Sequence, residues 1–505
     1  MRVHLVGVAG TGMGQLAKLL RDAGHDVSGS DVAFDPPMGP ALEAAGVRCL
    51  PGWRAENITS DIELVVVGNA IRKDNVEALR AIELDLPRAS MSGTLRERFL
   101  AGKRPLVVAG THGKTTTSAM CAWILETAGL EPGFFIGGLP KNFGTGARAA
   151  SERRKIVGTS AKAPPFVVEG DEYDAVYWHK KPKFFDYVGA PGSSSELAGS
   201  TSSGAAPTIE KSLVTIITSV EHDHIDIYPS AESYEQQFAE LAALVPESGL
   251  IACDARDVRA REIVSKHARA RTAFYALEGD DTGDVTPTWL GAMVPADPES
   301  GAQPFDLYLG GSYGGRFALK VPGAHNVRNA IGALAACCEG FGVDVEKARQ
   351  ALATFEGVRR RQDLLGRPNG IAVYDDFAHH PTAVDETLRA LRSRHPEGRL
   401  WAVFEPRSAT ACRNIHQREY ATAFRAADRV LFAPLGRTNI PEAERLDVTQ
   451  IASAIGDGAW AAPSVDGIVE RIATEARPGD VVALLSNGAF GGIHARLLEE
   501  LGKRS

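Results

Sequence analysis

The sequence lacks the features that would assign it to several specialised classes of protein. Its six cysteines include no pair at C-x-x-C spacing, no apolar run reaches membrane-spanning length, and the net charge is −8. These absences exclude a disulfide framework, a cysteine zinc module, a membrane-spanning protein and a general nucleic-acid binder. Residues 2–7 predict a buried strand, not a signal peptide. We expect a reduced, cytoplasmic protein that binds neither nucleic acid nor membrane.

The stretch Gly110-Thr111-His112-Gly113-Lys114-Thr115-Thr116 is the most informative one present. It follows an apolar strand and begins a helix, so its backbone N–H groups and the helix dipole favour a bound phosphate. Lys114 would reach the terminal phosphates and Thr115 would ligate Mg²⁺. The usual longer loop needs a glycine where Val108 stands, so this is the shorter G-x-x-G-K-T form. A glycine turn that binds nothing is the alternative, but a lysine and three threonines pack poorly.

A second glycine-rich turn spans residues 7–14, between a predicted strand and a predicted helix over residues 15–23. The strand that follows ends at Asp31. A glycine turn followed by an acidic residue about twenty positions later is typical of dinucleotide-binding domains. Strands joined by helices predict a parallel sheet with ligands at the strand C-termini. The pattern indicates a phosphate-bearing nucleotide more reliably than it indicates which one.

Acidic and histidine residues end the later strands. Glu169-Gly170-Asp171-Glu172 follows a strand at 166–168, and His222-Asp223-His224 follows a strand at 213–218. At the sheet edge that carries the Lys114 loop, such residues would hold Mg²⁺ and position a nucleophile. A zinc site at His222 and His224 is the alternative, although it would need further ligands.

The chain divides into three α/β units, which we expect at residues 1–101, 102–357 and 358–505. The first and third would be Rossmann-like and the second P-loop ATPase-like. Two irregular insertions interrupt the middle unit at about 148–165 and 189–207, and the second reads as a flexible surface segment. Basic clusters at 359–361 and at Lys180, Lys181 and Lys183 would supply local positive charge or form plain solvated faces.

Seven stretches, in this order, together resemble the Mur ligases, the ATP-dependent amide-forming enzymes of bacterial peptidoglycan assembly. Taken singly, each has a simpler explanation, such as a strand-end charge or a helix cap. The stretches lie at residues 7–13, 110–117, 169–172, 223–224, 325–329, 360–361 and 375–381. The resemblance covers nearly the whole chain outside the two insertions.

The resemblance implies roles for individual residues. ATP would be bound by Gly110, Thr111, His112, Gly113, Lys114, Thr115, Thr116, Asn326, Asn329 and Arg361. Mg²⁺ would be bound by Thr115, Glu169 and His224. Substrates would be bound by Gly10, Thr11, Gly12, Met13, Asp31, Asn69, Arg407, Ser408 and Asn487. The catalytic residues would be Lys114, Glu169, His224, Asp375 and His379.

The resemblance also implies a two-step reaction. A carboxylate of UDP-N-acetylmuramate would attack the γ-phosphate of ATP, and an amine would then displace phosphate from the resulting acyl phosphate. Stretches at 68–70, 375–382, 405–408 and 486–494 favour the recycled murein tripeptide L-Ala-γ-D-Glu-meso-diaminopimelate as the amine, with L-alanine as the alternative. We expect a monomer. An NAD-dependent dehydrogenase and a non-enzymatic nucleotide-binding scaffold are competing hypotheses, but neither uses the Lys114 loop, His224 and His379 together.

One departure from the family pattern carries a prediction. Several Mur ligases have a carbamylated lysine about fifteen residues beyond the metal-binding histidine, but residues 225–248 here contain no lysine. Another group or water must take the place of that metal-bridging anion.

Overall fold

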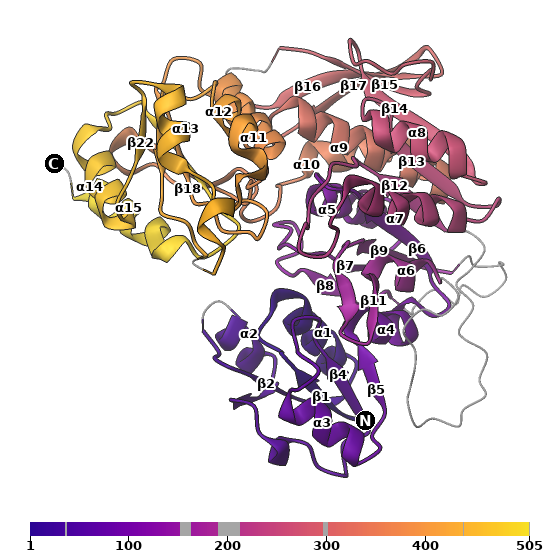
Figure 1. The fold of residues 1–505 in the computed structure, drawn as a ribbon. Coiled ribbons are helices and arrows are strands. Elements are labelled where there is room, and N and C mark those ends of the chain that lie inside the picture. Colours follow the sequence, from indigo (N-terminus) through magenta and orange to yellow (C-terminus); the bar gives the residue numbers. More distant parts are fainter. Residues whose placement is uncertain (36–37, 152–162, 190–212, 296–300, 438, 504–505) are drawn as a thin grey trace.

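The computed structural model describes all residues except 36–37, 152–162, 190–212, 296–300, 438 and 504–505. Three large sheets follow one another along the chain and form three bodies (Figure 1). The predicted three-domain α/β architecture is confirmed. No described helix is long and apolar enough to cross a membrane.

The first body is a five-stranded parallel sheet with strand order β3-β2-β1-β4-β5. Its elements are β1 Arg2–Val6, α1 Thr11–Asp22, β2 Asp26–Asp31, α2 Met38–Ala44, β3 Arg48–Pro51, β4 Leu64–Val67, α3 Val76–Glu83, β5 Arg88–Ser90 and α4 Met91–Leu95. A π-helix, Arg96–Leu100, leads out of it. Helix α1 begins four residues earlier than predicted, because the end of the glycine turn forms the first helical turn.

The second body is a ten-stranded mixed sheet with strand order β17-β16-β15-β14-β13-β12-β6-β9-β7-β8. Its strands are β6 Arg104–Ala109, β7 Gly133–Phe135, β8 Ala147–Arg148, β9 Pro165–Glu169, β12 Val214–Ile217, β13 Leu250–Asp254, β14 Arg271–Leu277, β15 Trp289–Met293, β16 Gln303–Leu309 and β17 Ser312–Leu319. The strands from β14 to β17, of which β15 to β17 pair antiparallel, were not predicted. A separate hairpin pairs β10 Asp174–Val176 with β11 His179–Pro182.

Helices cover both faces of this central sheet. On one face, α5, α9 and α10 share a hydrophobic core; on the other, α6, α7 and α8 share a core that continues into the first body. The helices are α5 Lys114–Thr127, α6 Lys183–Val188, α7 Ala231–Leu244, α8 Val258–His267, α9 Ala324–Ala335 and α10 Val345–Thr354, with a π-helix at Ala336–Gly340. The sequence predicts a helix over 330–340, and α9 begins six residues before that.

Only the ends of the two predicted insertions lie in the described part of the chain. Arg148 lies in β8 and Pro165 begins β9, so both ends of the first insertion belong to the central sheet. Gly189 ends α6 in the left-handed conformation. Residues 152–162 and 190–207 lie outside the described part of the chain.

The third body is a six-stranded sheet with strand order β18-β19-β23-β20-β21-β22, parallel except for β18. Its elements are β18 Asp363–Gly366, β19 Ala372–Asp376, α11 Pro381–Arg394, β20 Leu400–Phe404, α12 Gln417–Ala423, β21 Arg429–Phe432, α13 Val448–Ile455, β22 Ala459–Ala461, α14 Val465–Glu475, β23 Val481–Leu485 and α15 Ile493–Gly502. The sequence predicts a helix at 381–394 and strands at 400–404, 429–432 and 481–485, and the structure has α11, β20, β21 and β23 there.

The segment that joins the second and third bodies is strained. Gly357 has φ 86°, and the non-glycine residues Arg360 and Gln362 have φ 60° and 47°. Left-handed backbone at such residues costs of order 1–3 kcal/mol each and persists only where the surroundings hold it. The Lys141 ammonium lies 2.6 Å from the buried Asp363 carboxylate at the end of this segment. These strained residues are the ones whose backbone angles would change if the third body moved.

Candidate active site

The loop between β6 and α5 is built around two glycines in left-handed conformations. Gly110 has φ 129° and Gly113 has φ 79°. A Cβ at Gly113 would overlap the Asn329 side chain, so Asn329 of α9 packs directly on the loop. The N–H groups of Thr111 and His112 donate to Ser219, at 3.0 Å each. Two of the predicted phosphate-binding amides are thus already partnered, and the donors left for an anion begin at Gly113 and continue into the first turn of α5.

Lys114 does not extend into open space. Its ammonium donates to both carboxylate oxygens of Glu172, at 2.9 and 3.0 Å, and Glu172 is fully buried. Burial alone would lower the pKa of Lys114, but the Glu172 charge outweighs it and raises that pKa above its usual value. The loop lysine is therefore held charged by an internal carboxylate until a phosphate competes for it.

Glu172 also faces His224, the predicted metal ligand. His224 Nε2 lies 3.8 Å from Glu172 Oε2, and the His224 ring packs on Tyr173 with centroids 4.3 Å apart. His224 itself has φ 53°, a strained value for a histidine. Its backbone N–H donates to the Asp223 carboxylate at 2.7 Å, which fixes this turn. The structure thus groups His224 with Glu172, and Glu169 has different partners.

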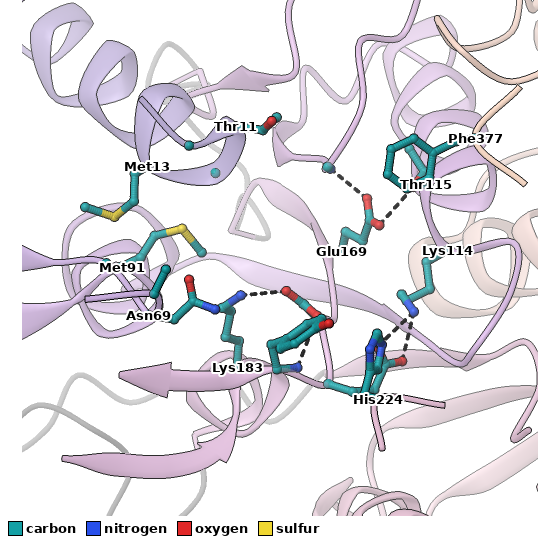
Figure 2. Close-up of a pocket in the computed structure, with 18 of the residues that line it drawn as sticks. Thr11, Met13, Asn69, Met91, Lys114, Thr115, Glu169, Lys183, His224 and Phe377 are labelled. Carbon is teal, nitrogen blue, oxygen red and sulfur yellow. Dashed lines mark hydrogen bonds and ion pairs between the residues drawn. The ribbon is translucent and has the colours of Figure 1, made fainter. Parts of the chain in front are cut away.

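Glu169 ends β9 and lies against the start of α5. Its two oxygens accept hydrogen bonds from Thr115 Oγ1 at 2.9 Å and from the Gly137 N–H at 2.6 Å. From the third body, Arg361 donates to Thr115 Oγ1 at 3.4 Å. Figure 2 shows Glu169 and Thr115 facing each other, with Phe377 beside Thr115. A threonine hydroxyl next to a carboxylate at a phosphate loop is an oxygen donor set that suits Mg²⁺.

The N-terminal glycine turn faces the same space. Asp31 accepts hydrogen bonds from the N–H groups of Ala9 at 2.8 Å and Val32 at 2.7 Å, so its carboxylate shapes the turn. Thr11, Met13 and Asn69 lie across from Lys114 and Thr115 in Figure 2. The first and second bodies therefore present their loops to each other.

A single cavity of about 830 Å³ joins these groups. All three bodies contribute to its wall. The predicted residues that line it are Gly10, Thr11, Gly12, Met13, Asp31, Asn69, Thr111, His112, Gly113, Lys114, Thr115, Glu169, His224, Arg361 and His379. Burial lowers the pKa of His379, so this ring is neutral near pH 7.

Two smaller cavities adjoin the loop. One, of about 250 Å³, is lined by His112, Gly113 and Asn329 and includes the buried Asp254, whose pKa burial raises to about 7. The other, of about 50 Å³, contains Thr116, Asn326 and Arg361. The two predicted asparagines are therefore buried beside the loop and line these smaller cavities, whereas Glu172 lines the large one.

Four predicted residues of the third body, and Gly110, line none of these three cavities. Asp375 accepts a hydrogen bond from Arg360 at 3.1 Å and lies 3.2 Å from His494 Nε2. Arg407 is half-exposed, and a Cβ at Gly488 would overlap its side chain. Ser408 follows Arg407 in one loop, and Asn487 precedes Gly488 in another. Ser408 Oγ accepts a hydrogen bond from the Ala411 N–H at 2.9 Å.

The sequence interpretation missed several charged groups of the large cavity. It quoted Glu172 only as part of a motif, and it left Lys183 open between local positive charge for a substrate and a plain solvated face. Lys183 is buried and its ammonium lies 2.5 Å from Asp171, whose pKa it holds below the usual value despite burial. The signal available was the acidic run at 169–172, but no local pattern indicates which carboxylate meets which lysine.

The comparisons with known proteins agree with this geometry. Three family models match in chain order: the Mur ligase family catalytic domain over residues 2–101, the Mur ligase middle domain over 198–337, and the Mur ligase glutamate ligase domain over 360–488. The chain belongs to the Mur ligase family, whose members are ATP-dependent ligases. The three-domain fold is that of this family.

Three individual proteins are similar to this chain over nearly its whole length. The UDP-N-acetylmuramate–L-alanyl-γ-D-glutamyl-meso-2,6-diaminoheptandioate ligase of Escherichia coli K12 is 34% identical over 100% of this chain and 99% of its own. The crystal structure of a murein peptide ligase from Psychrobacter arcticus is 31% identical, covers 100% of this chain and 99% of its own, and superposes with a TM-score of 0.70. The UDP-N-acetylmuramate–L-alanine ligase of Paenarthrobacter aurescens is 32% identical over 99% of this chain and 97% of its own.

Proposed function

We propose that this chain joins the carboxylate of UDP-N-acetylmuramate to the amine of L-Ala-γ-D-Glu-meso-diaminopimelate, with cleavage of ATP to ADP and phosphate. The Escherichia coli and Psychrobacter arcticus relatives, which match over their full length, carry names of this activity. The observation that carries the proposal is the single cavity that joins the N-terminal glycine turn to the Lys114 loop and to His379.

We divide the chain at residues 101 and 357 into a UDP-sugar domain, an ATP domain and a peptide domain. In the first, the turn at residues 10–13 would bind the UDP diphosphate, with Asp31 and Asn69 near the nucleotide. In the second, Asn326 and Asn329 would lie on the adenine side of ATP, where the smaller cavities adjoin the loop. The sugar carboxylate would then approach the γ-phosphate in the space between Thr11 and Lys114.

The first chemical step needs neutralisation of charge on the transferred phosphoryl group. Lys114 would leave Glu172 in part and donate to the phosphate, while N–H groups from Gly113 onward hold the other oxygens. Because Lys114 is already held charged, it needs no proton uptake on binding. Arg361 of the third domain would add a second positive charge when that domain is closed.

Two donor sets fit divalent cations. Thr115 and Glu169 supply oxygens 2.9 Å apart, and Glu172 with His224 supplies a buried carboxylate beside an imidazole. Bound Mg²⁺ would neutralise phosphate charge at these positions. Glu172 is also the buried anion next to His224, so we propose that it takes the place of the carbamylated lysine.

The second step would bring the peptide amine to the acyl carbon from the third domain. His379 lines the cavity, and Arg407 would pair with a peptide carboxylate in a bidentate manner. Asp375, Arg407, Ser408 and Asn487 would reach the substrates only after a rearrangement, since none lines the three cavities described above. The enzyme that uses L-alanine is the second candidate, because a relative of that name is almost equally similar. We propose a cytoplasmic monomer.

The test is product formation with purified chain, UDP-N-acetylmuramate, ATP and Mg²⁺. ADP and phosphate should appear only when an amine substrate is also present, and mass spectrometry should find the UDP-N-acetylmuramoyl tripeptide. AMP and pyrophosphate, or ADP release that needs no amine, would contradict the proposal.

A further inference from the structure

Two histidines and a glutamate meet where the ATP loop faces the third body. His112 belongs to the loop, Glu221 follows β12, and His380 directly precedes α11. His112 Nε2 lies 3.3 Å and His380 Nδ1 lies 3.5 Å from the same oxygen, Glu221 Oε2. Their three potential ligand atoms all lie within 4.8 Å of one another.

His380 is the least satisfied member of this cluster. Its side chain is 8% exposed, yet neither ring nitrogen has a hydrogen-bond partner among the described residues. Its ring packs between those of His112 and His416, with centroids 4.7 and 4.6 Å away. A buried imidazole without a partner is costly, since its nitrogens lose water and gain nothing in return.

The spacing of the cluster suits a tetrahedral ion. Zn–N and Zn–O bonds of about 2.0–2.1 Å give a regular tetrahedron edges of about 3.3 Å. Two of the three ligand separations are 3.3 and 3.5 Å, so only the two imidazoles would need to approach each other. Two histidines and one carboxylate form a known zinc ligand set with a fourth position open to water, and imidazole favours such ions over Mg²⁺.

We propose that His112, Glu221 and His380 bind one first-row transition-metal dication of the Zn²⁺ or Co²⁺ type. The site shares no residue with Thr115, Glu169, Glu172 or His224, so it is distinct from the proposed Mg²⁺ positions. The Thr382 hydroxyl, which donates to Glu221 Oε2 at 2.8 Å, would orient the carboxylate. Because the ligands come from two bodies, a bound ion would link the ATP loop to the third body even when no nucleotide is bound.

The experiment uses the full chain, stripped of metal and kept in excess Mg²⁺, with Co²⁺ as the probe and no nucleotide. One equivalent of Co²⁺ should produce the intense visible absorption of a four-coordinate site, and Zn²⁺ should displace it. His380→Gln and Glu221→Gln should each weaken Co²⁺ binding about 100-fold or more, since even loss of an outer partner costs 10–100-fold.

Two control variants make the assignment specific. His222→Gln removes a histidine of the same segment, whose Nε2 already contacts the Tyr228 carbonyl oxygen at 2.9 Å. Glu169→Gln removes an oxygen ligand of the proposed Mg²⁺ position. Both should keep the four-coordinate spectrum. Circular dichroism identifies any variant that fails to fold, and Glu221→Gln, which retains the Thr382 partner, guards against misfolding of His380→Gln.

A second measurement tests the link between the two bodies. Zn²⁺ should raise the unfolding temperature of the chain and of His222→Gln, but not that of His380→Gln. Absence of a four-coordinate Co²⁺ spectrum, or equal Co²⁺ affinity in the chain and in both ligand variants, would overturn the proposal. Neither readout requires ligase activity, so the proposal can fail while the proposed function holds.

Discussion

Replacing Lys114 by alanine should destabilise the protein as well as inactivate it. The change removes the only strong partner that the fully buried Glu172 carboxylate has among the described residues, with His224 Nε2 next at 3.8 Å. Breaking a buried ion pair from one side costs about 3–5 kcal/mol. Glu172 can lower this cost by binding a proton. The free energy needed to keep it protonated is therefore an upper bound on the loss of stability, and this bound depends on pH.

The bound follows from the unfolded-state pKa of a glutamate, about 4.3. Keeping the carboxyl protonated costs about 1.36 kcal/mol per pH unit above that value, hence about 3.7 kcal/mol at pH 7 and about 1.6 kcal/mol at pH 5.5. In the variant the folded-state pKa of Glu172 lies above the unfolded one. Burial raises the pKa of Glu172 in the unchanged chain too, so the deficit is small below that pKa and grows as the pH rises towards the higher pKa of the variant.

Thermal unfolding of the chain and the variant at matched pH measures the deficit. The upper bound at pH 7 corresponds to a shift of at most roughly 7–15 °C, at about 2–4 °C per kcal/mol for a domain of this size. Lys181→Ala is the control, because its ion pair with Glu240 is exposed and should contribute less than about 1 kcal/mol. Lys114→Ala with Glu172→Gln should recover stability without activity. A deficit that is below 1 kcal/mol at pH 7, or the same at both pH values, would refute the reasoning.

Three further predictions concern activity and motion. Because residues 225–248 have no lysine and Glu172 lies beside His224, activity should not change when CO₂-depleted enzyme receives bicarbonate; reversible rescue would contradict this. The strained junction at Arg360 and Gln362 predicts a smaller radius of gyration by X-ray scattering when an ATP analogue and the UDP-sugar bind, and unchanged dimensions would count against it. Arg407→Ala should raise the KM for the tripeptide at least tenfold and leave the KM for ATP unchanged. A raised KM for ATP would contradict a role for Arg407 in peptide binding.

Much of this molecule could be predicted from local patterns. The strand, glycine loop and helix around Lys114 are adjacent in sequence, so their order predicts their geometry. The partners of Lys114 and His224 come from a different strand, and no spacing rule pairs them with Glu172 in preference to Glu169. The antiparallel strands β15 to β17 are half-exposed, and glycines interrupt β15 and β17, so their apolar pattern is weak. Arg407 follows a correctly predicted strand, but its distance from the cavity depends on how the third body is placed.

The most direct test of the central claim is a competition in one reaction. Equal concentrations of L-Ala-γ-D-Glu-meso-diaminopimelate and L-alanine are supplied with limiting UDP-N-acetylmuramate, ATP and Mg²⁺, and the two products are counted by mass spectrometry. We predict that the tripeptide product exceeds the alanine product at least a hundredfold, because only the tripeptide offers several carboxylates to the third domain. A predominance of UDP-N-acetylmuramoyl-L-alanine would assign the chain to the L-alanine branch and contradict the account.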